Sequence, residues 1–460
     1  MKENSSFRDP SGFIFYHDNK IYRAVTHLYK EEYDLLIESG LYDLLIKKKY
    51  LIPHQEIKDP HLVEGSNVYK ILQPESVEMI SYPYEWSFSQ LKDAALLTLK
   101  IQELALTHGM SLKDASAYNI QFHKGRPVFI DTLSFEKYIE NKPWNAYGQF
   151  CRHFLAPLAL MSHTDIHLNN LLKNYIDGIP LDLTRKLLPF KTRFHVGLYM
   201  HLYLHAQIQN KYQGSKVKVS ENNHKLSKNS MLGIISSLRQ SITAQKWVPK
   251  GTEWGDYQEG DIHTAEYKRR KAEIIDKFIT QAEPHSILDM GANTGYFSRI
   301  AAKKGANVIS CDIDPACVEK NYLTTKQNKE DNLLPLFFDL FNPSPAIGWA
   351  NEERTTLQKR CKTDLVMALA LIHHLCISGN IPLEKVASYF RQFAECLIIE
   401  FVPKTDPKVQ VLLINREDIF PDYTQEKFEA IFSNHYQIVG FEKAGEDERI
   451  IYLLKRKNND

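Results

Sequence analysis

From about Ile274 to the end of the chain, short apolar segments alternate with segments of helical periodicity, and this alternation restricts the possible folds more than any other feature. Strands that alternate with helices are typical of a mostly parallel sheet wound by helices. The second half is therefore predicted to be an α/β domain. The segments expected to form strands are SILDM, NVISCDI, LPLFFDL, DLVMALAL and CLIIEF, followed by YQIVGFEK and RIIYLLKR.

A glycine-containing turn follows the first of these strands. The strand is expected to end at Met290, the turn to run from Gly291 to Gly295, and a helix to begin near Tyr296. Because glycine has no Cβ, such a turn lets the backbone approach a ligand closely and exposes the first N–H groups of the helix. The turn therefore predicts a ligand site at the carboxyl end of this strand.

Acidic residues stand at three successive strand ends. Asp312, which lies 23 residues after Asp289, could accept hydrogen bonds from both hydroxyls of a ribose. Asp289 shortly precedes the turn, where its carboxylate would repel a pyrophosphate but would suit a positively charged group such as the amino group of a methionine moiety. Asp339 follows the third strand. These positions predict a nucleoside ligand that carries a positive charge.

Three segments in this region, LDMGANTGYFS, CDID and FFDLFNP, resemble the first three motifs of class I S-adenosylmethionine-dependent methyltransferases. The resemblance extends from about residue 247 to the C-terminus. It implies a Rossmann-like sheet of seven strands whose last pair is antiparallel, with S-adenosylmethionine as the methyl donor. Carried over by position, it implies that the cofactor-binding residues are Asp289, Gly291, Asn293 and Gly295 around the methionine part, Asp312 at the ribose and Asp339 at the adenine amino group.

Residues for the methyl acceptor are less distinct. Methyl transfer depends mainly on positioning, and it needs a base only if the acceptor must lose a proton. His373 and His374 follow the fourth strand, where this fold usually holds its acceptor, and one of them could be the base because imidazole titrates near neutral pH. The alternative is that one caps a helix and the other packs. Trp254 and Tyr257 are candidates for a lid, or for ordinary helix packing on the sheet.

The front half contains a second motif, formed by Asp114, Asn119 and Asp131. Its spacing is similar to the catalytic segment of kinase-like phosphotransferases, especially the aminoglycoside and choline kinase group. The resemblance implies that Asp114 orients an acceptor hydroxyl and that Asn119 and Asp131 hold magnesium. Arg23 stands where the phosphate-binding lysine is expected, and no Gly-rich loop is visible. Turn chemistry around a hairpin is the alternative.

Secondary structure in the front half is predicted from periodicity. Alternating apolar and polar residues predict a hairpin over 12–26, and a helical period follows over 30–49. Two short strands are expected over 68–72 and 78–82, followed by a helix over 89–106. A small strand-rich lobe followed by a helical lobe is therefore predicted.

Charge is distributed unevenly along the chain. The net charge of +1 comes from 57 basic and 56 acidic residues, but 152–250 holds 14 Lys and Arg against 4 Asp and Glu. Two interpretations of this basic region stay open: a solvated helical face, or a docking surface for an anionic acceptor such as RNA or a phosphorylated or acidic glycan. The longest strongly apolar run, Leu365–Ile372, is too short to span a bilayer, so a soluble cytoplasmic protein is expected.

Three domains are predicted: a strand-rich lobe over 1–85, a mainly helical lobe over 86–240 and a methyltransferase domain over 241–460. The favoured hypothesis is a methyltransferase acting on an unidentified small molecule, glycan, protein or RNA, with the kinase-like front module recognising the acceptor. One alternative is a phosphotransferase that uses magnesium and ATP and carries an auxiliary methyltransferase domain. Another is a catalytically degenerate interaction protein regulated by its cofactor.

Overall fold

Two compact units make up the computed structural model, which describes residues 2–59, 62–63, 67–204, 227–252, 265–414, 417–444 and 448–457. Unit 1 comprises Met1–Val248 and Ala346–Thr355, and unit 2 comprises Pro249–Pro345 and Thr356–Asp460. The segment 346–355, which the sequence places between two strands of the methyltransferase domain, belongs to unit 1. There the Arg8 guanidinium donates hydrogen bonds to both carboxylate oxygens of Glu353.

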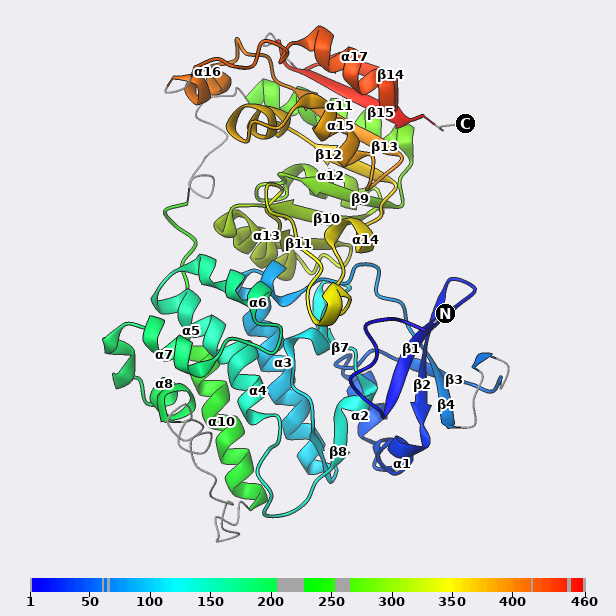
Figure 1. The fold of residues 1–460 in the computed structure, drawn as a ribbon, viewed down its shortest axis with the longest axis vertical. Coiled ribbons are helices and arrows are strands. Elements are labelled where there is room, and N and C mark those ends of the chain that lie inside the picture. The colour runs from blue at the N-terminus through cyan, green and yellow to red at the C-terminus, as the bar shows by residue number, and fades with distance from the viewer. Residues whose placement is uncertain are drawn as a thin grey trace. The chain divides into compact units, whose positions relative to one another are not determined.

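Unit 2 contains a seven-stranded sheet in the order β11-β10-β9-β12-β13-β15-β14 (Figure 1). Neighbouring strands from β11 to β13 are parallel, and β15 is antiparallel to both β13 and β14. The predicted seven strands and their antiparallel last pair are confirmed. Their bounds are β9 Ser286–Met290, β10 Asn307–Asp312, β11 Leu333–Phe337, β12 Leu365–Ala368, β13 Cys396–Phe401, β14 Tyr436–Lys443 and β15 Ile450–Arg456.

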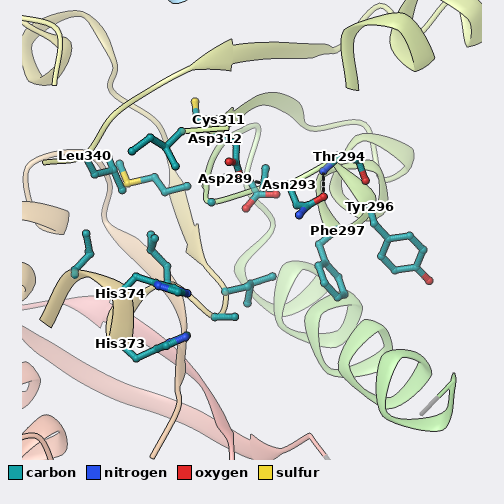
Figure 2. Close-up of a pocket in the computed structure, with 18 of the residues that line it drawn as sticks. Asp289, Asn293, Thr294, Tyr296, Phe297, Cys311, Asp312, Leu340, His373 and His374 are labelled. Atoms are coloured by element: carbon teal, nitrogen blue, oxygen red, sulfur yellow. Dashed lines mark hydrogen bonds between the residues drawn. The ribbon is translucent and has the colours of Figure 1, made fainter. Parts of the chain in front are cut away.

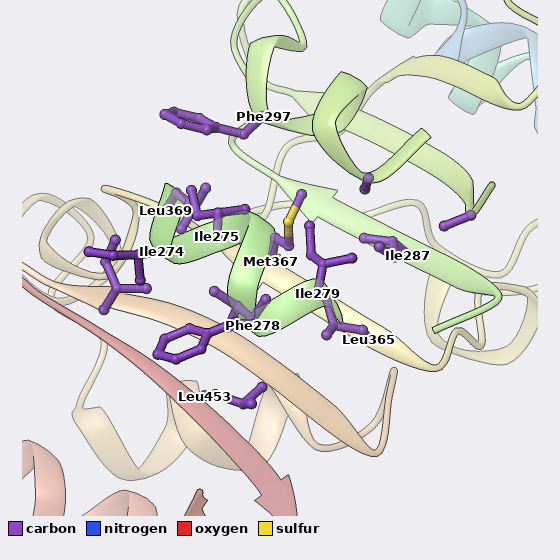
Figure 3. Packing of buried hydrophobic residues seen from close by; sticks show 14 of the residues in the cluster. Ile274, Ile275, Phe278, Ile279, Ile287, Phe297, Leu365, Met367, Leu369 and Leu453 are labelled. Atoms are coloured by element: carbon purple, nitrogen blue, oxygen red, sulfur yellow. The ribbon is translucent and has the colours of Figure 1, made fainter. Parts of the chain in front are cut away.

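Helices cover both faces of this sheet, which explains why central strands such as β12 and β13 are buried along almost their whole length. Helix α11 packs Ile275 and Phe278 against one face, where Leu453 of β15 also points (Figure 3). The neighbouring Tyr452 points to the other face, where its ring lies 5.1 Å from that of Phe428 in α17. The helices of unit 2 are α11 Ala265–Ala282, α12 Tyr296–Lys303, α13 Pro315–Asn328, α14 Leu357–Arg360, α15 Leu383–Phe390, α16 Pro407–Leu413 and α17 Gln425–His435.

The strand order reverses at β9. From β9 the chain continues to β10 and β11 on one side and later returns to β12 on the other side. In open α/β sheets, the crevice at the carboxyl ends of the strands beside such a reversal is the usual ligand site. Because β9 and β10 are parallel neighbours, Asp289 and Asp312 reach the same edge of the sheet.

Unit 1 begins with the predicted hairpin, β1 (Gly12–His17) and β2 (Lys20–Thr26), in a sheet of order β1-β2-β4-β3. Strand β4 (Val68–Pro74) was expected, whereas β3 (His54–Ile57) was not. The strand predicted over 78–82 is wrong, because the segment forms no ladder there. Instead the Ser81 N–H donates to the Gln121 side chain at 2.8 Å.

The helix predicted over 30–49 is divided into α1 (Lys30–Glu38) and α2 (Leu41–Lys47). Gly40 separates them with a φ of 74°, a left-handed conformation that glycine adopts readily. Helix α3 (Phe88–Thr107) matches its prediction and begins with a capping box between Ser87 and Gln90.

The rest of unit 1 is mainly helical and contains two small sheets. The sheets are β5 Met110–Leu112 with β8 Phe135–Lys137 and β6 Ile120–His123 with β7 Arg126–Phe129; the remaining helices are α4 Tyr147–Phe150, α5 Ala156–His163, α6 Leu171–Asn174, α7 Leu181–Leu187, α8 Val196–Leu198 and α10 Lys228–Ala244.

Among the described residues of both units, no helix is both long and apolar enough to cross a lipid bilayer.

Candidate functional site

A cavity of about 730 Å³ opens in unit 2 where the strand order reverses. The turn after β9 and the end of β10 form one side, and the segment after β12 forms the other. Figure 2 shows Asp289, Asn293 and Asp312 on the first side and His373 and His374 on the second. Helix α11 and the segment after β11 contribute further lining residues. The cavity has the size of a small-molecule ligand site.

Asp289 is a buried carboxylate at the wall of the cavity, with 1% of its surface exposed. Its Oδ2 accepts a hydrogen bond from the Ser298 hydroxyl at 2.6 Å. Burial, together with the neighbouring charge of Asp312, raises the pKa of Asp289 to about 7, although the Ser298 hydrogen bond opposes this shift. A cation that binds beside Asp289 would favour the ionised form of its carboxyl group and so lower this pKa.

The turn after β9 is held open by left-handed backbone conformations. Gly291 has a φ of 79°, and a Cβ at this position would lie 3.4 Å from the Leu371 side chain. Asn293 has a φ of 50°, and its side-chain oxygen accepts the Thr294 N–H at 2.7 Å (Figure 2). Gly295, also predicted for this site, does not line the cavity but caps α12 with a φ of 79°. The turn lines the cavity with Gly291, Ala292, Asn293 and Thr294.

Asp312 connects this turn to the end of β10. Its Oδ2 accepts the Asn293 N–H at 2.7 Å, and its Oδ1 accepts the Asp314 N–H at 2.8 Å. Burial raises the pKa of the Asp312 carboxyl to about 6. Each carboxylate oxygen has a further lone pair with which it can accept a hydroxyl.

Asp339 differs from the other two acids because it does not line the cavity. Its Oδ1 accepts the N–H groups of Phe341 at 2.9 Å and Asn342 at 3.2 Å, which shapes the loop after β11. Phe338 and Leu340, on either side of it in sequence, do line the cavity. This loop thus presents apolar surface of a kind that can contact a flat aromatic ring.

His373 and His374 both line the cavity, with ring centroids 4.2 Å apart. Burial lowers the pKa of His373 to about 3 and that of His374 to about 4. Both imidazoles are therefore neutral near pH 7, and their low basicity makes them poor proton acceptors. They remain able to donate or accept a hydrogen bond.

A buried ionic network that was not predicted from the sequence lies beside the cavity, and Tyr267, Lys271 and Arg449 of this network line it. The Lys271 ammonium lies 2.7 Å from Glu400 Oε2, and the Tyr267 hydroxyl donates to Glu400 Oε1 at 2.8 Å. Arg449 Nε donates to Asp406 Oδ2 at 2.7 Å. Although burial opposes it, the charges of Lys271 and Arg449 lower the pKa of Glu400 to about 2. The sequence signal for this network is Glu400, the single acidic residue within the apolar segment CLIIEF.

The lid candidates Trp254 and Tyr257 lie outside the described residues. Tyr267, in the same stretch of sequence, is described and lines the cavity from α11. The position of the other two aromatics relative to the cavity therefore stays a prediction.

In unit 1 the kinase-like motif forms a cluster in which protein donors engage the carboxylates. Arg23 forms an ion pair with Asp131 at 2.6 Å, and the Ser134 hydroxyl donates to Asp131 Oδ2 at the same distance. The Asn119 amide donates to the Ser134 hydroxyl, and Asp114 accepts from the Gln149 amide. Burial and the charge of Asp131 raise the pKa of Asp114. Within the described residues, no group of three or more His, Cys, Asp or Glu side chains is arranged to hold a metal ion.

Two sequence comparisons bear on the family to which the chain belongs. Residues 263–398 match the family described as "Methyltransferase domain". The chain is 36% identical over 463 residues to the nodulation protein NoeA of Rhizobium meliloti (strain 1021), covering 98% of this chain and 95% of that protein.

Among solved structures, the chain is similar to the bifunctional kinase-methyltransferase WbdD, with 17% identity, a TM-score of 0.29 and coverage of 41% of this chain and 39% of WbdD. It spans less than half of that protein. It is also similar to the N-methyltransferase NodS of Bradyrhizobium japonicum WM9, with 10% identity, a TM-score of 0.32 and coverage of 42% of this chain and 99% of NodS.

Proposed function

Because this chain belongs to the family of the nodulation protein NoeA and carries a methyltransferase domain, we propose that it transfers a methyl group from S-adenosylmethionine to an acceptor recognised with the help of unit 1. One observation carries the proposal. Asp289 and Asp312 converge on the open glycine turn at the wall of a cavity that is large enough for a nucleoside ligand.

In this proposal the methyl donor is bound by the turn after β9, the end of β10 and the loop after β11. Asp289 is buried and accepts a hydrogen bond from Ser298, and it forms no ion pair with another described residue. Its carboxylate therefore suits the ammonium of the methionine part. Asp312 accepts the ribose hydroxyls with its remaining lone pairs. Phe338 and Leu340 pack on the adenine. Asp339, which does not line the cavity, holds the loop that carries them, so its contact with the adenine amino group, which the resemblance implies, stays a prediction. When bound, S-adenosylmethionine supplies an electrophilic methyl carbon on its sulfonium.

The acceptor is assigned to the side of His373 and His374. Their lowered pKa values argue against removal of a proton from a weakly acidic acceptor by either ring. We assign them instead to orienting the acceptor by hydrogen bonds while the apolar wall excludes water. Orientation of the acceptor against the donor accounts for most of the catalysis that such a transfer needs.

Unit 1 is proposed to contribute acceptor recognition. The match to NoeA covers 98% of the chain, so both units are shared by the two proteins. The Arg23–Asp131 ion pair does not favour the alternative of magnesium-dependent phosphotransfer, because it engages the carboxylate that would hold the metal. Acceptor recognition is therefore the role we assign to this part of the chain.

Binding of the donor is expected to strengthen as the pH rises. The ionised form of Asp289 attracts an ammonium, and its pKa of about 7 means that the carboxyl is mostly protonated below neutrality. We expect the dissociation constant for S-adenosylmethionine to rise about tenfold between pH 8 and pH 6. Isothermal titration calorimetry in two buffers of different ionisation enthalpy would also show proton release near pH 7. In Asp289→Asn the proton release should disappear; if it persists, another group titrates.

Transfer itself can be tested with S-adenosylmethionine labelled in its methyl group. The protein is incubated with the donor and a cell extract, which is then separated into RNA, protein, glycan and small-molecule fractions. We expect label in one fraction, and its loss with Asp312→Ala. Donor binding without label in any fraction would instead favour the interaction-protein hypothesis.

A further inference from the structure

Exposed apolar side chains gather in one short stretch of unit 1, at the end of α7 and beyond it. Phe190, Phe194 and Val196 are 66%, 76% and 73% exposed. Soluble proteins rarely expose many large apolar side chains close together, and where they do, the side chains mark an interaction site. We call this stretch the 187–204 surface; its exposed apolar members are Leu187, Phe190, Phe194, Val196, Tyr199, Met200 and Leu204.

The 187–204 surface is an ordered part of unit 1. The rings of Phe190 and Phe194 pack edge to face with centroids 5.8 Å apart. The hydroxyls of the buried residues Thr192 and Tyr203 are hydrogen-bonded at 2.7 Å, which ties the segment after α7 to the one after α8. The exposed rings are therefore presented by a fixed backbone.

The same surface is cationic. Lys186, Lys191 and Arg193 are exposed, and the sequence has no acidic residue from 183 to 204. The nearest acid before this stretch, Asp182, lies 3.0 Å from Arg185 and is neutralised by it. The Arg193 guanidinium lies over the Phe190 ring at 4.9 Å, so charge and apolar surface are interleaved.

We propose that the 187–204 surface binds the surface of a lipid membrane that contains anionic phospholipids. Aromatic and aliphatic side chains enter the boundary between headgroups and acyl chains, while neighbouring Lys and Arg side chains attract the anionic headgroups. Val196 and Met200 favour a membrane over RNA, because aliphatic side chains gain little from phosphates or base edges. None of the residues of this surface lines the cavity of unit 2, so vesicle binding can be measured separately from donor binding.

Vesicle flotation with the full-length protein tests the proposal. Vesicles of phosphatidylcholine alone are compared with vesicles that contain about 30% phosphatidylglycerol, and we expect binding on the order of tenfold stronger to the anionic ones. Raising the salt from about 0.1 M to about 0.5 M should weaken that binding by screening. The variants Phe190→Ser/Phe194→Ser and Lys191→Gln/Arg193→Gln should each lose most of it.

The matched control is Phe7→Ser/Leu28→Ser, which removes two side chains of unit 1 that are 48% and 66% exposed outside this surface. It should bind vesicles like the unchanged protein. Circular dichroism and thermal unfolding verify that the variants are folded. Equal binding to both kinds of vesicle, or unchanged binding by both test variants, would overturn the proposal. So would binding to single-stranded RNA, or self-association through Phe190 and Phe194, if either occurred without vesicle binding.

Discussion

Replacement of Asp312 by alanine is expected to weaken the binding of S-adenosylmethionine by about 100-fold. The substitution removes the charged carboxylate that would accept two hydrogen bonds from the ribose hydroxyls. The substitution also releases the Asn293 N–H, which Asp312 holds at 2.7 Å, so the turn under the methionine part loses a support. Isothermal titration calorimetry at pH 8, where Asp289 and Asp312 are ionised, measures the change.

Asp331→Ala is the matched control for this experiment. Asp331 is exposed in the loop before β11 and does not line the cavity. Its replacement should leave the dissociation constant unchanged. Near-ultraviolet circular dichroism should show that Asp312→Ala keeps its tertiary structure. An Asp312→Ala protein that is folded and binds the donor as tightly as the unchanged protein would refute the role assigned to this carboxylate.

The second large effect is expected for Glu400→Gln, which should lower the free energy of unfolding of unit 2 by about 3 kcal/mol. The substitution leaves the Lys271 ammonium, 7% exposed, without the carboxylate that it pairs with at 2.7 Å. A loss of this size corresponds to a fall in the melting temperature on the order of 10 °C, measurable by differential scanning calorimetry. Because the pKa of Glu400 is lowered to about 2, the stabilisation is present above its ordinary pKa of 4.5 and is lost as the pH falls toward 2.

Two further variants test whether the loss of stability in Glu400→Gln comes from the unpaired Lys271 ammonium. Lys271→Met/Glu400→Gln should recover part of the stability, since the buried ammonium is removed as well. Glu273→Gln, on the same helix as Lys271, removes an exposed partner of Arg269 and should cost less than about 0.5 kcal/mol. If Glu400→Gln were no more destabilising than Glu273→Gln, the network would not stabilise the site.

Much of unit 2 could be predicted because its sequence pattern is local. The strand ending at Met290, the turn from Gly291 to Gly295 and the helix from Tyr296 follow one another directly. In a parallel sheet, strand order then brings Asp289 and Asp312 to one edge. The helical spacing could not reveal the break at Gly40, since a single left-handed residue hardly changes an apolar period over 30–49.

The features that could not be predicted from the sequence depend on contacts between residues that are far apart in the chain. Lys271, Glu400 and Arg449 meet because β15 pairs antiparallel with β13 and α11 packs on the sheet; no local pattern contains this information. Similarly, residues 346–355 belong to unit 1 through contacts such as that of Glu353 with Arg8, which is 345 positions away in sequence. Ser81 lies outside any strand for a comparable reason, since its partner is the side chain of Gln121.

Titration of the unchanged protein with S-adenosylmethionine at pH 8 tests the central claim most directly. The account predicts one donor molecule bound per chain, with affinity that weakens as the pH falls toward 6. Absence of binding under these conditions, by a protein shown to be folded, would contradict it.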